Sequence, residues 1–557
     1  MIMARIRMHF NMLKLKSMPR HTIKQATGTT GRFANVLPVL VLVSLLLAGC
    51  DSMVIFKREA RDYVAGFAGG VAGDEPSAVL VAQKILKGEG SAADAAIAAY
   101  FAMSVTLPSA ASLGGGGACL VIDREKNKVE SLTFMAGGMD GNRPVVPANV
   151  RAIYALHAKY GQLPWRQLVA PAENMARFGA PVSRAFARDL VAAQGHITPS
   201  SDMGRTFANR QGRLVREGDN LRQLDLAATL SIIRGRPAAF FSGPGKQRII
   251  RAYGAAGMPI SSADVDRARP VWKAPITVRR GNQAADFLPT PAGLVGAQAW
   301  AMMYRDGAWK SANNREKPHL IAEVSRRSMA GAGRWLHSPA ELEKAAPSVV
   351  SEKRTEALMA SFDSGRKTKF AIPEGGGHPA PVDQGGASVI AADQFGQAVA
   401  CSFTMNGLMG SVRIAPKTGI IIAARPDPAM RGMSSGSLMV LRYDDQNQLE
   451  FMASATGGAA APITMVTVAL RAMLDKQNLE KASRAPRLFA PMIPDQVLME
   501  SGNRGLAKTL ENAGHRVAPV SAMIRLNGFF CPAGFDGHRS RCELRTDRRG
   551  FGFASQL

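Results

Sequence analysis

The sequence predicts a protein that mixes α-helices with β-strands, and two regions indicate this. From Glu75 to Leu107, Ala, Val, Ile and Leu recur at helical spacing. Four glycines, Gly114 to Gly117, then precede a strand-like run from Ala118 to Asp123. Farther along, a connector rich in Gly and Pro, residues 371–387, separates a helical region from further strands. With 557 residues, the chain is long enough to bury a large core.

The composition is that of a globular protein with an unusual excess of positive charge. Hydrophobic residues make up 46% and charged residues 20%, but the formal net charge is +26. The first 49 residues hold seven Lys or Arg and no acid, so +19 remains beyond them, spread along the chain. We interpret this as a basic surface that favours anionic neighbours. We predict no nucleic-acid partner, because no recognition motif is present and only 6% of residues are aromatic.

The N-terminal segment predicts export. Residues 36–47 form an apolar run of twelve, which follows a basic stretch and is too short to span a bilayer. The run ends in Leu47-Ala48-Gly49-Cys50, which resembles a bacterial lipoprotein signal. The resemblance implies that residues 1–49 are removed, that Cys50 is lipidated, and that residues 50–67 are a linker on the periplasmic side of the membrane. Asp51 slightly favours the inner membrane.

The remaining cysteines fall into two groups. Cys119 and Cys401 lie in apolar, strand-like segments, so we expect buried, hydrophobic side chains. Cys531 and Cys542 bracket a loop in the expected C-terminal tail, residues 531–557, and in an oxidising periplasm they predict a disulfide. No second Cys pair or His pair accompanies them, so we predict no metal site, and nothing indicates an organic cofactor.

Several motifs together resemble the gamma-glutamyltransferase (gamma-glutamyltranspeptidase) family. They are Ser402-Phe403-Thr404-Met405-Asn406 with Gly410-Ser411, Pro171-Ala172-Glu173, Leu224-Asp225-Leu226, Phe240-Phe241-Ser242-Gly243, and His319 and His515 at positions that we interpret as structural. The resemblance covers about residues 68–530. It implies an α+β fold, the four-layer αββα sandwich of the N-terminal nucleophile (Ntn) hydrolases. A large-subunit-like part, residues 68–383, and a small-subunit-like part, residues 384–530, would complete one domain.

The resemblance also assigns roles to individual residues. Gly457 and Gly458 match paired glycines whose N–H groups face the oxyanion of the reaction, and glycine permits that close approach. Thr404 matches a threonine that helps to activate the nucleophile, and Asn406 matches an asparagine that holds the amino end of the donor substrate. Ser434 and Ser435 match a serine pair that donates to the donor's α-carboxylate.

Two departures from the family pattern concern substrate charge. Met135 stands where the family has an arginine that clamps the α-carboxylate, and such a bidentate contact is a strong one. In the segment that holds the donor's ammonium in the family, this chain has Arg425, and only Asp427 keeps an acid nearby. We therefore expect gamma-glutamyl compounds to bind poorly, and a differently charged acyl donor, or none, to fit better.

The third departure concerns the nucleophile, a threonine in the family. Counting back from Asn406 without gaps places Gly386 at its position, whereas anchoring on Ser388-Val389-Ile390 places Gln384 there. Neither residue can attack a carbonyl. Ser388 is the alternative nucleophile, and using it requires two residues to be deleted from the strand, a change that preserves side-chain alternation.

Three functions remain open at this point. The chain is a self-cleaving amidase that uses Ser388 on gamma-glutamyl or related amides; or an uncut, inactive relative that binds a peptide, an amino-acid derivative or a protein in the old cleft; or a basic membrane-surface protein without a small ligand. The joint presence of Asn406, Ser434, Ser435, Gly457 and Gly458 disfavours the third function. The sequence does not indicate an oligomeric state.

Overall fold

The computed structural model describes residues 64–67, 69–138, 143–332, 339–369, 385–427, 436–535 and 540–557. The expected signal peptide, the Cys50 lipidation site, Gln384 and the pair Ser434 and Ser435 therefore lie outside the described residues. No helix within these ranges combines the length and the apolar character needed to cross a bilayer.

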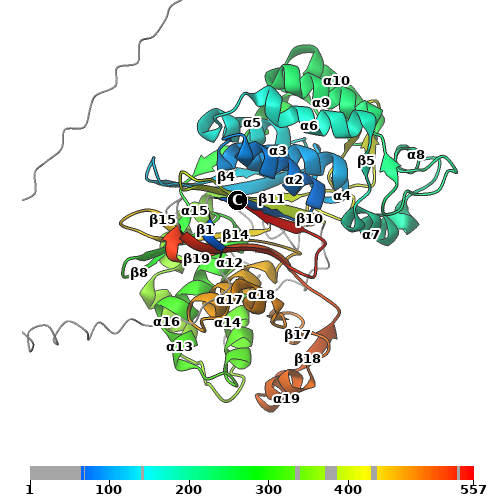
Figure 1. Cartoon of the computed structure of the whole chain (residues 1–557). Helices are drawn as coiled ribbons and strands as arrows, with labels where there is room; N and C mark the ends of the chain where they lie inside the picture. The colour runs from blue at the N-terminus through cyan, green and yellow to red at the C-terminus, as the bar shows by residue number, and fades with distance from the viewer. Residues whose placement is uncertain are drawn as a thin grey trace, which may run out of the picture. The chain divides into compact units, whose positions relative to one another are not determined.

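Two antiparallel sheets of seven strands form the centre of the molecule (Figure 1). The first sheet has the order β21 (Phe553–Gln556), β2 (Gly70–Gly73), β10 (Gly386–Ala392), β11 (Gln397–Thr404), β3 (Gly116–Asp123), β4 (Lys128–Phe134) and β7 (Val271–Lys273). The second sheet has the order β1 (Val64–Phe67), β20 (Ser540–Thr546), β19 (Arg525–Phe535), β15 (Gln448–Thr456), β14 (Ser437–Tyr443), β9 (Gln283–Phe287) and β8 (Ile276–Arg280).

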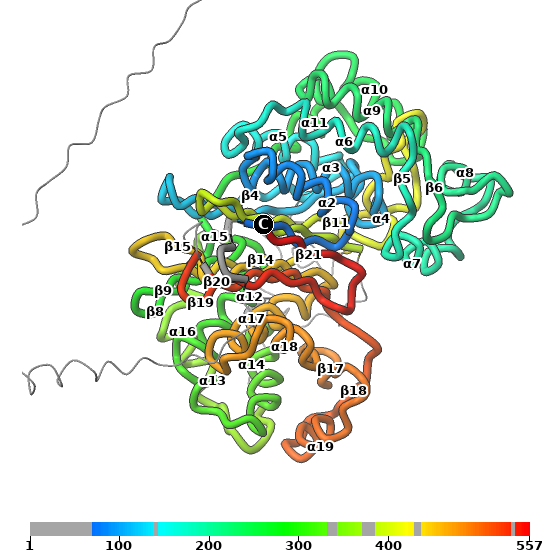
Figure 2. Tube along the Cα trace, in the orientation of Figure 1, coloured from blue at the N-terminus to red at the C-terminus, as the bar shows by residue number. Residues whose placement is uncertain are grey.

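Helices cover the outer face of each sheet. On the first sheet lie α2 (Pro76–Lys87), α3 (Ala92–Thr106), α4 (Pro108–Ala111), α5 (Asn149–Tyr160), α6 (Trp165–Phe178), α9 (Leu224–Gly235), α10 (Gly243–Ala255) and α11 (Ser262–Arg267), with α7 (Arg184–Ala193) and α8 (Asp202–Thr206) at one end (Figure 2). On the second lie α12 (Pro291–Trp300), α13 (Ala308–Ser311), α14 (Lys317–Ala332), α15 (Pro339–Val349), α16 (Glu352–Met359), α17 (Ala461–Met473) and α18 (Leu479–Arg484). A small sheet of β16 (Leu488–Phe489), β17 (Val497–Glu500) and β18 (Val517–Val520) carries α19 (Arg504–Asn512).

Three apolar cores hold these layers together. One lies between the first helical layer and the first sheet, one between the two sheets, and one between the second sheet and its helices. Strand β10 contributes to two of them, because its side chains alternate between faces. Val389 faces the first helical layer, whereas Ile390 faces the second sheet. The predicted four-layer αββα sandwich of the Ntn hydrolase type is confirmed.

Helix α3 illustrates how the sequence specifies a buried layer. Its sequence, AADAAIAAYFAMSVT, is apolar on all sides, and all of its residues are buried between α2, α6 and the first sheet. It begins with a capping box, in which the Ser91 side chain accepts from the Asp94 N–H and the Asp94 side chain accepts from the Ser91 N–H. Alanine gives the helix a narrow body, so the flanking layers approach closely.

The segments expected as a linker and as a C-terminal tail both contribute to the sheets. Val64–Phe67 forms β1 and pairs with β20, although residues 50–67 were expected to be a linker. Residues 531–557 are not a separate tail: β19 runs through Cys531, and β20 and β21 belong to different sheets. The tail prediction was wrong because the inward-facing apolar residues of this segment, such as Cys542 and Leu544, are few and stand among Arg and Gly. Their alternation is too weak to predict a strand from the sequence.

The four cysteines among the described residues form two disulfides. Cys531 and Cys542 are joined, as the sequence predicts. Cys119 and Cys401 were expected to be free, hydrophobic side chains; they are buried but joined to each other. They lie directly opposite one another on β3 and β11. This correction required the register of the sheet, because 282 residues separate the two in sequence.

The two disulfides should contribute unequally to stability. All four side chains are buried, so replacement by alanine removes similar packing from each site. The loops that they close differ greatly, with sequence separations of 282 and 11 residues. Chain-entropy scaling gives about 5–6 kcal/mol for the long loop and about 3 kcal/mol for the short one. Urea unfolding should therefore show a lower free energy of unfolding for C119A/C401A than for C531A/C542A, and equal losses would contradict this prediction.

Candidate functional site: polar residues between the two sheets

The space between the sheets is apolar at one end and polar at the other. Nine residues form the polar end, which we call the inter-sheet polar cluster: Asp74, Gly386, Ser388, Ser402, Thr404, Ser454, Thr456, Arg525 and Asn527. They come from four adjoining strands, β10 and β11 in one sheet and β15 and β19 in the other, and from the end of β2. Strand alternation turns these side chains inward, in line with Ile390 and Met452 of the inter-sheet core.

The ladder between β10 and β11 sets the geometry of this cluster. It runs without a bulge from Gly386 opposite Thr404 to Ala392 opposite Ala398. Thr404 is buried, and its Oγ1 accepts a hydrogen bond of 2.9 Å from the N–H of Asn406. Thr404, the residue that the resemblance places beside the nucleophile, is thus paired with Gly386 and not with Ser388.

Gly386 lies at the start of β10 and faces the end of β15. A Cβ added at Gly386 would lie 3.3 Å from the Cβ of Thr456 and 3.3 Å from the backbone oxygen of Phe403. Arg525 donates a hydrogen bond of 2.8 Å to the Gly386 carbonyl. The void beside these residues is about 10 Å³, which is room for one water molecule.

Ser388 lies two residues farther along β10 and is buried. Its N–H donates to Asp74 Oδ2 at 2.8 Å, and its Oγ accepts from the Asn527 side chain at 2.8 Å. Its carbonyl accepts from the Asp74 N–H at 3.2 Å. A cut before Ser388 would therefore break a peptide bond in a strand that is paired with β11 on one side and with β2 on the other.

Asp74 is the buried acid of the cluster. Burial raises the pKa of this carboxyl group, while Arg525, Asn527 and Ser388 act in the opposite direction. Asn527 also donates to Asp74 Oδ1 at 2.9 Å. Sequence reasoning missed Asp74, Arg525 and Asn527. The available signal was a polar residue at an inward-facing position of an otherwise apolar strand, as in the run RLNGFF of β19.

The paired glycines follow β15 immediately. Gly457 and Gly458 have φ angles of 125° and 104°, a region that favours glycine. Within the described residues, neither N–H donates a hydrogen bond. Thr456 precedes the pair. Its Oγ1 is buried and has no hydrogen-bond partner among the described residues, and the same holds for the hydroxyl groups of Ser402 and Ser454. Buried polar groups are normally satisfied, so this end of the cluster is suited to a polar ligand.

Asn406 is held in place by the backbone. It has a φ angle of 57°, and its side-chain amide donates to the carbonyls of Ala136 and Ala424, both at 3.0 Å. Its Oδ1 is buried and has no hydrogen-bond partner in the part of the chain that the structure describes. Arg425 and Asp427 follow on the same segment and are exposed. Across the described residues, no group of three or more His, Cys, Asp or Glu side chains is arranged to hold a metal ion.

The comparisons with known proteins agree with this geometry. A family model described as gamma-glutamyltranspeptidase matches residues 78–531. The chain belongs to the gamma-glutamyltranspeptidase family. It is 25% identical to the glutathione hydrolase proenzyme of Escherichia coli over 505 residues, which is 82% of this chain and 87% of that protein. It is 24% identical to scoloptoxin SSD14 of Scolopendra dehaani, covering 92% of this chain and 98% of that protein.

A solved structure shares the fold. The cephalosporin acylase of Bacillus halodurans superposes with a TM-score of 0.73 at 21% identity, covering 91% of this chain and 99% of that one. As for other members of the gamma-glutamyltranspeptidase family, the architecture is therefore that of an Ntn hydrolase, while the residues of the site are this chain's own.

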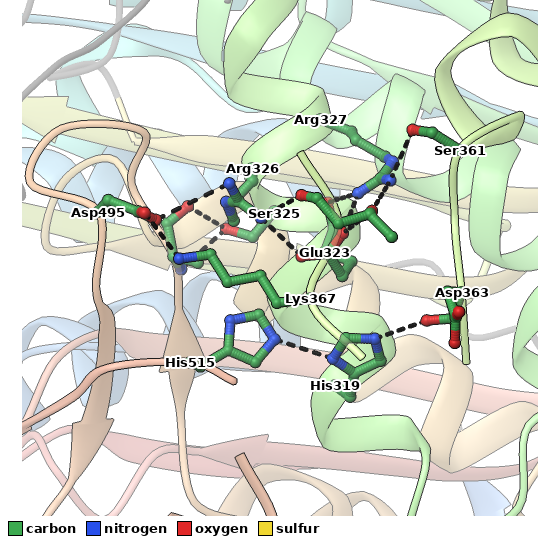
Figure 3. Close-up of polar contacts among 12 residues, drawn as sticks. His319, Glu323, Ser325, Arg326, Arg327, Ser361, Asp363, Lys367, Asp495 and His515 are labelled. Atoms are coloured by element: carbon green, nitrogen blue, oxygen red, sulfur yellow. Dashed lines mark hydrogen bonds and ion pairs between the residues drawn. The ribbon is translucent and has the colours of Figure 1, made fainter. Parts of the chain in front are cut away.

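The family's two matched histidines lie away from the inter-sheet polar cluster, on α14 and before β18 (Figure 3). His319 Nε2 is 2.8 Å from the Asp363 carbonyl, which can only accept, so this nitrogen carries the proton. His319 Nδ1 then accepts from His515 Nε2 at 2.8 Å. Glu323, four residues along α14, forms ion pairs with Arg326 and Arg327. These contacts join α14 to the small sheet and support a structural role.

We predict that the His319–His515 pair makes the folded protein less stable in acid. Burial, and then His319, lowers the pKa of His515 to about 4; Glu323 raises it, and Lys367 and Arg326 lower it further. Between pH 6.5 and pH 4, the unfolded state binds a proton that the folded state does not, so stability falls by about 2–3 kcal/mol as the pH drops. Urea unfolding across this range should show a smaller pH dependence for His515→Asn. His196→Asn, at an exposed histidine, should keep the wild-type dependence.

Proposed function

We propose that this chain is a gamma-glutamyltranspeptidase family member that remains one polypeptide and binds a small amide or amino-acid derivative without hydrolysing it. The observation that carries the proposal is the position of Gly386. It pairs with Thr404, and a Cβ at this position would lie 3.3 Å from the Cβ of Thr456, which precedes the glycine pair. Glycine has no side chain with which to attack a carbonyl. The E. coli relative is named a proenzyme. The absence of an attacking side chain at Gly386 is therefore a specific difference that an experiment can test.

The surroundings of Ser388 support the same conclusion. An N-terminal nucleophile uses its own free α-amine as the base, so the N–H of Ser388 would have to become that amine. Here it is a strand-interior amide that donates to Asp74. The Ser388 hydroxyl accepts from Asn527 and lies 3.4 Å from Asp74 Oδ2. These contacts give Ser388 a packing role that accounts for its presence.

Ligand binding would account for the groups of the site that have no partner among the described residues. The N–H groups of Gly457 and Gly458 and the hydroxyl group of Thr456 supply donors for a carbonyl or carboxylate oxygen. Asn406 supplies a fixed acceptor, because its amide nitrogen is already bound to two carbonyls. This set of groups suits an amide or an amino-acid derivative better than an apolar compound.

The uncut state is tested first by intact mass and gel analysis of the purified chain, with Ser388→Ala beside it. We expect one polypeptide in both samples and no release of p-nitroaniline from gamma-glutamyl-p-nitroanilide. Ser388→Ala should lower the free energy of unfolding by about 1–2 kcal/mol, because the Asn527 donor loses its acceptor. Two fragments in the wild-type sample, the smaller beginning at Ser388, with an uncut variant, would establish the serine nucleophile instead.

We further propose that the protein is anchored by lipid at Cys50 on the outer side of a bacterial inner membrane. Two disulfides support an oxidising compartment, because such bonds are rare in the cytosol. The apolar run and the Leu47-Ala48-Gly49-Cys50 sequence support cleavage and acylation.

Metabolic labelling with a fatty acid tests the anchor directly. Wild-type protein expressed in a Gram-negative host should incorporate the label and sediment with membranes, because acyl chains on Cys50 hold it there. Cys50→Ser should lose both properties. A variant that still incorporates label, or a wild type without label, would contradict the lipid anchor.

A further inference from the structure

Two large apolar side chains stand in solvent at one end of the α6–α9 helix pair. Phe178, the last residue of α6, is 67% exposed, and Leu224, the first residue of α9, is 58% exposed. The N–H of Gln223 donates to the carbonyl of Ala176 at 2.8 Å, so the end of α6 lies beside the start of α9. Large apolar groups that are exposed together mark contact surfaces, whereas single ones need no explanation.

Helix α9 continues this apolar surface along its outer side. Leu224, Ala228 and Ile232 are all exposed and recur every four residues, so they lie along one face of the helix. In Figure 1, α6 and α9 lie on the far side of α3 from the first sheet. We call Phe178, Leu224, Ala228 and Ile232 the outer apolar ridge.

The helical layer that carries this ridge holds a dense excess of positive charge. Residues 143–273 lie wholly within the described part of the chain and contain 20 Lys or Arg and 8 Asp or Glu. Lys159 is paired with Glu130 on β4, and Lys273 also has a contact. If each of the eight acids in the range neutralises one further cation, ten cations remain. The excess therefore survives a full count of the acids in this layer.

Some of these cations lie beside the ridge. Arg222 immediately precedes α9, is exposed, and donates through Nε to the Arg177 carbonyl at 3.2 Å. Arg236, also exposed, follows the other end of α9. Arg210 and Arg222 share with Leu224 the lining of a surface cavity of about 730 Å³. The apolar ridge thus has cations at both of its ends.

Acids are present near the ridge as well, but they are fewer. Asp219 and Asp225 line the same cavity. The Asp219 carboxylate accepts from the N–H of Arg216 at 2.8 Å, and the Arg216 side chain is exposed. Local acids therefore reduce the positive charge at this end of α9 without reversing it.

This combination of apolar and cationic groups favours a membrane over a second copy of the chain. Two ridges brought together would also bring two cationic layers together, which costs electrostatic energy. A bilayer with anionic headgroups offers phosphates to the arginines and an apolar interior to the ridge. The proposed anchor has the same implication. Cys50 precedes Val64 by 14 residues, a length that reaches at most about 50 Å, so an anchored domain stays close to the bilayer.

We propose that the outer apolar ridge docks this protein on an anionic membrane surface. Phe178 and Leu224 enter the boundary between headgroups and acyl chains, and Arg210, Arg222 and Arg236 contact lipid phosphates. The helices of the second sheet then face away from the membrane. This inference rests on the membrane location proposed above, and it adds which face of the protein meets the bilayer.

Co-sedimentation with vesicles tests the surface without the anchor. The chain from Asp51 onward keeps every described element and lacks the acylated cysteine. It is mixed either with vesicles of phosphatidylglycerol and phosphatidylethanolamine or with vesicles of phosphatidylcholine. We expect binding to the anionic vesicles that weakens as sodium chloride is raised, and at least about tenfold weaker binding to phosphatidylcholine.

The apolar contribution is tested by two matched double variants. F178S/L224S should weaken binding to the anionic vesicles by at least about tenfold, because two apolar side chains no longer leave water on docking. L80S/F395S removes the same two residue types from exposed positions on α2 and in the turn between β10 and β11, and it should bind like the wild type. Circular dichroism shows whether each variant remains folded.

The cationic contribution is tested in the same way. R210Q/R222Q should weaken binding to the anionic vesicles by at least about tenfold and should reduce its dependence on salt. R315Q/R354Q removes two exposed arginines from the helical layer of the second sheet and should change neither property.

Three results would overturn the proposal: no binding to the anionic vesicles, equal binding by F178S/L224S and L80S/F395S, or equal binding by R210Q/R222Q and R315Q/R354Q. A dimer in analytical ultracentrifugation that F178S/L224S abolishes would also overturn it, because the ridge would then face a second copy. Failure of the anchor has a different signature. It appears as wild-type protein without fatty-acid label, whereas the vesicle experiment uses a chain that has no Cys50.

Discussion

The antiparallel pairing of β10 with β11 is the constraint on which the rest of the site depends. The two strands lie inside the first sheet, with β2 on one side and β3 on the other. Their unbroken register decides which residues face the second sheet, and a shift of one residue would turn Ser388 toward the helical layer. The same register brings Gly386 opposite Thr404, and that pair then meets Thr456 across the gap between the sheets.

Much of the fold could be predicted from local sequence, but the contacts within it could not. The apolar run of α3, the four glycines around the start of β3 and the family motifs were sufficient to predict the layers. The Cys119–Cys401 bond was not accessible, because it depends on which strand lies beside β3. Asp74 and Asn527 were missed for a similar reason. Asn527 is one polar residue in an apolar strand, Asp74 directly follows β2, and only the packing of the two sheets brings both to Ser388.

The nucleophile illustrates a subtler limit. Gly386 and Ser388 lie on the same face of β10, since two residues separate them, so the alternation of polar and apolar residues cannot distinguish them. Their cross-strand partners do distinguish the two residues. Gly386 is opposite Thr404 and close to the glycine pair, whereas Ser388 is opposite Ser402 and bound to Asp74 and Asn527. We therefore propose that the position suited to attack holds a glycine, and that the Ser388 hydroxyl serves the packing of the sheets.

The changes around the site have a consistent electrostatic direction. By the family resemblance, Met135 stands where an arginine would hold an α-carboxylate, and Arg425 adds a cation in the segment matched to ammonium binding. A zwitterionic amino-acid head group would meet repulsion at its ammonium and no clamp at its carboxylate. A ligand without an ammonium group would avoid that repulsion. Under the proposed function, loss of the nucleophile and redistribution of charge belong together, because a site that does not cut gamma-glutamyl bonds need not recognise the gamma-glutamyl group.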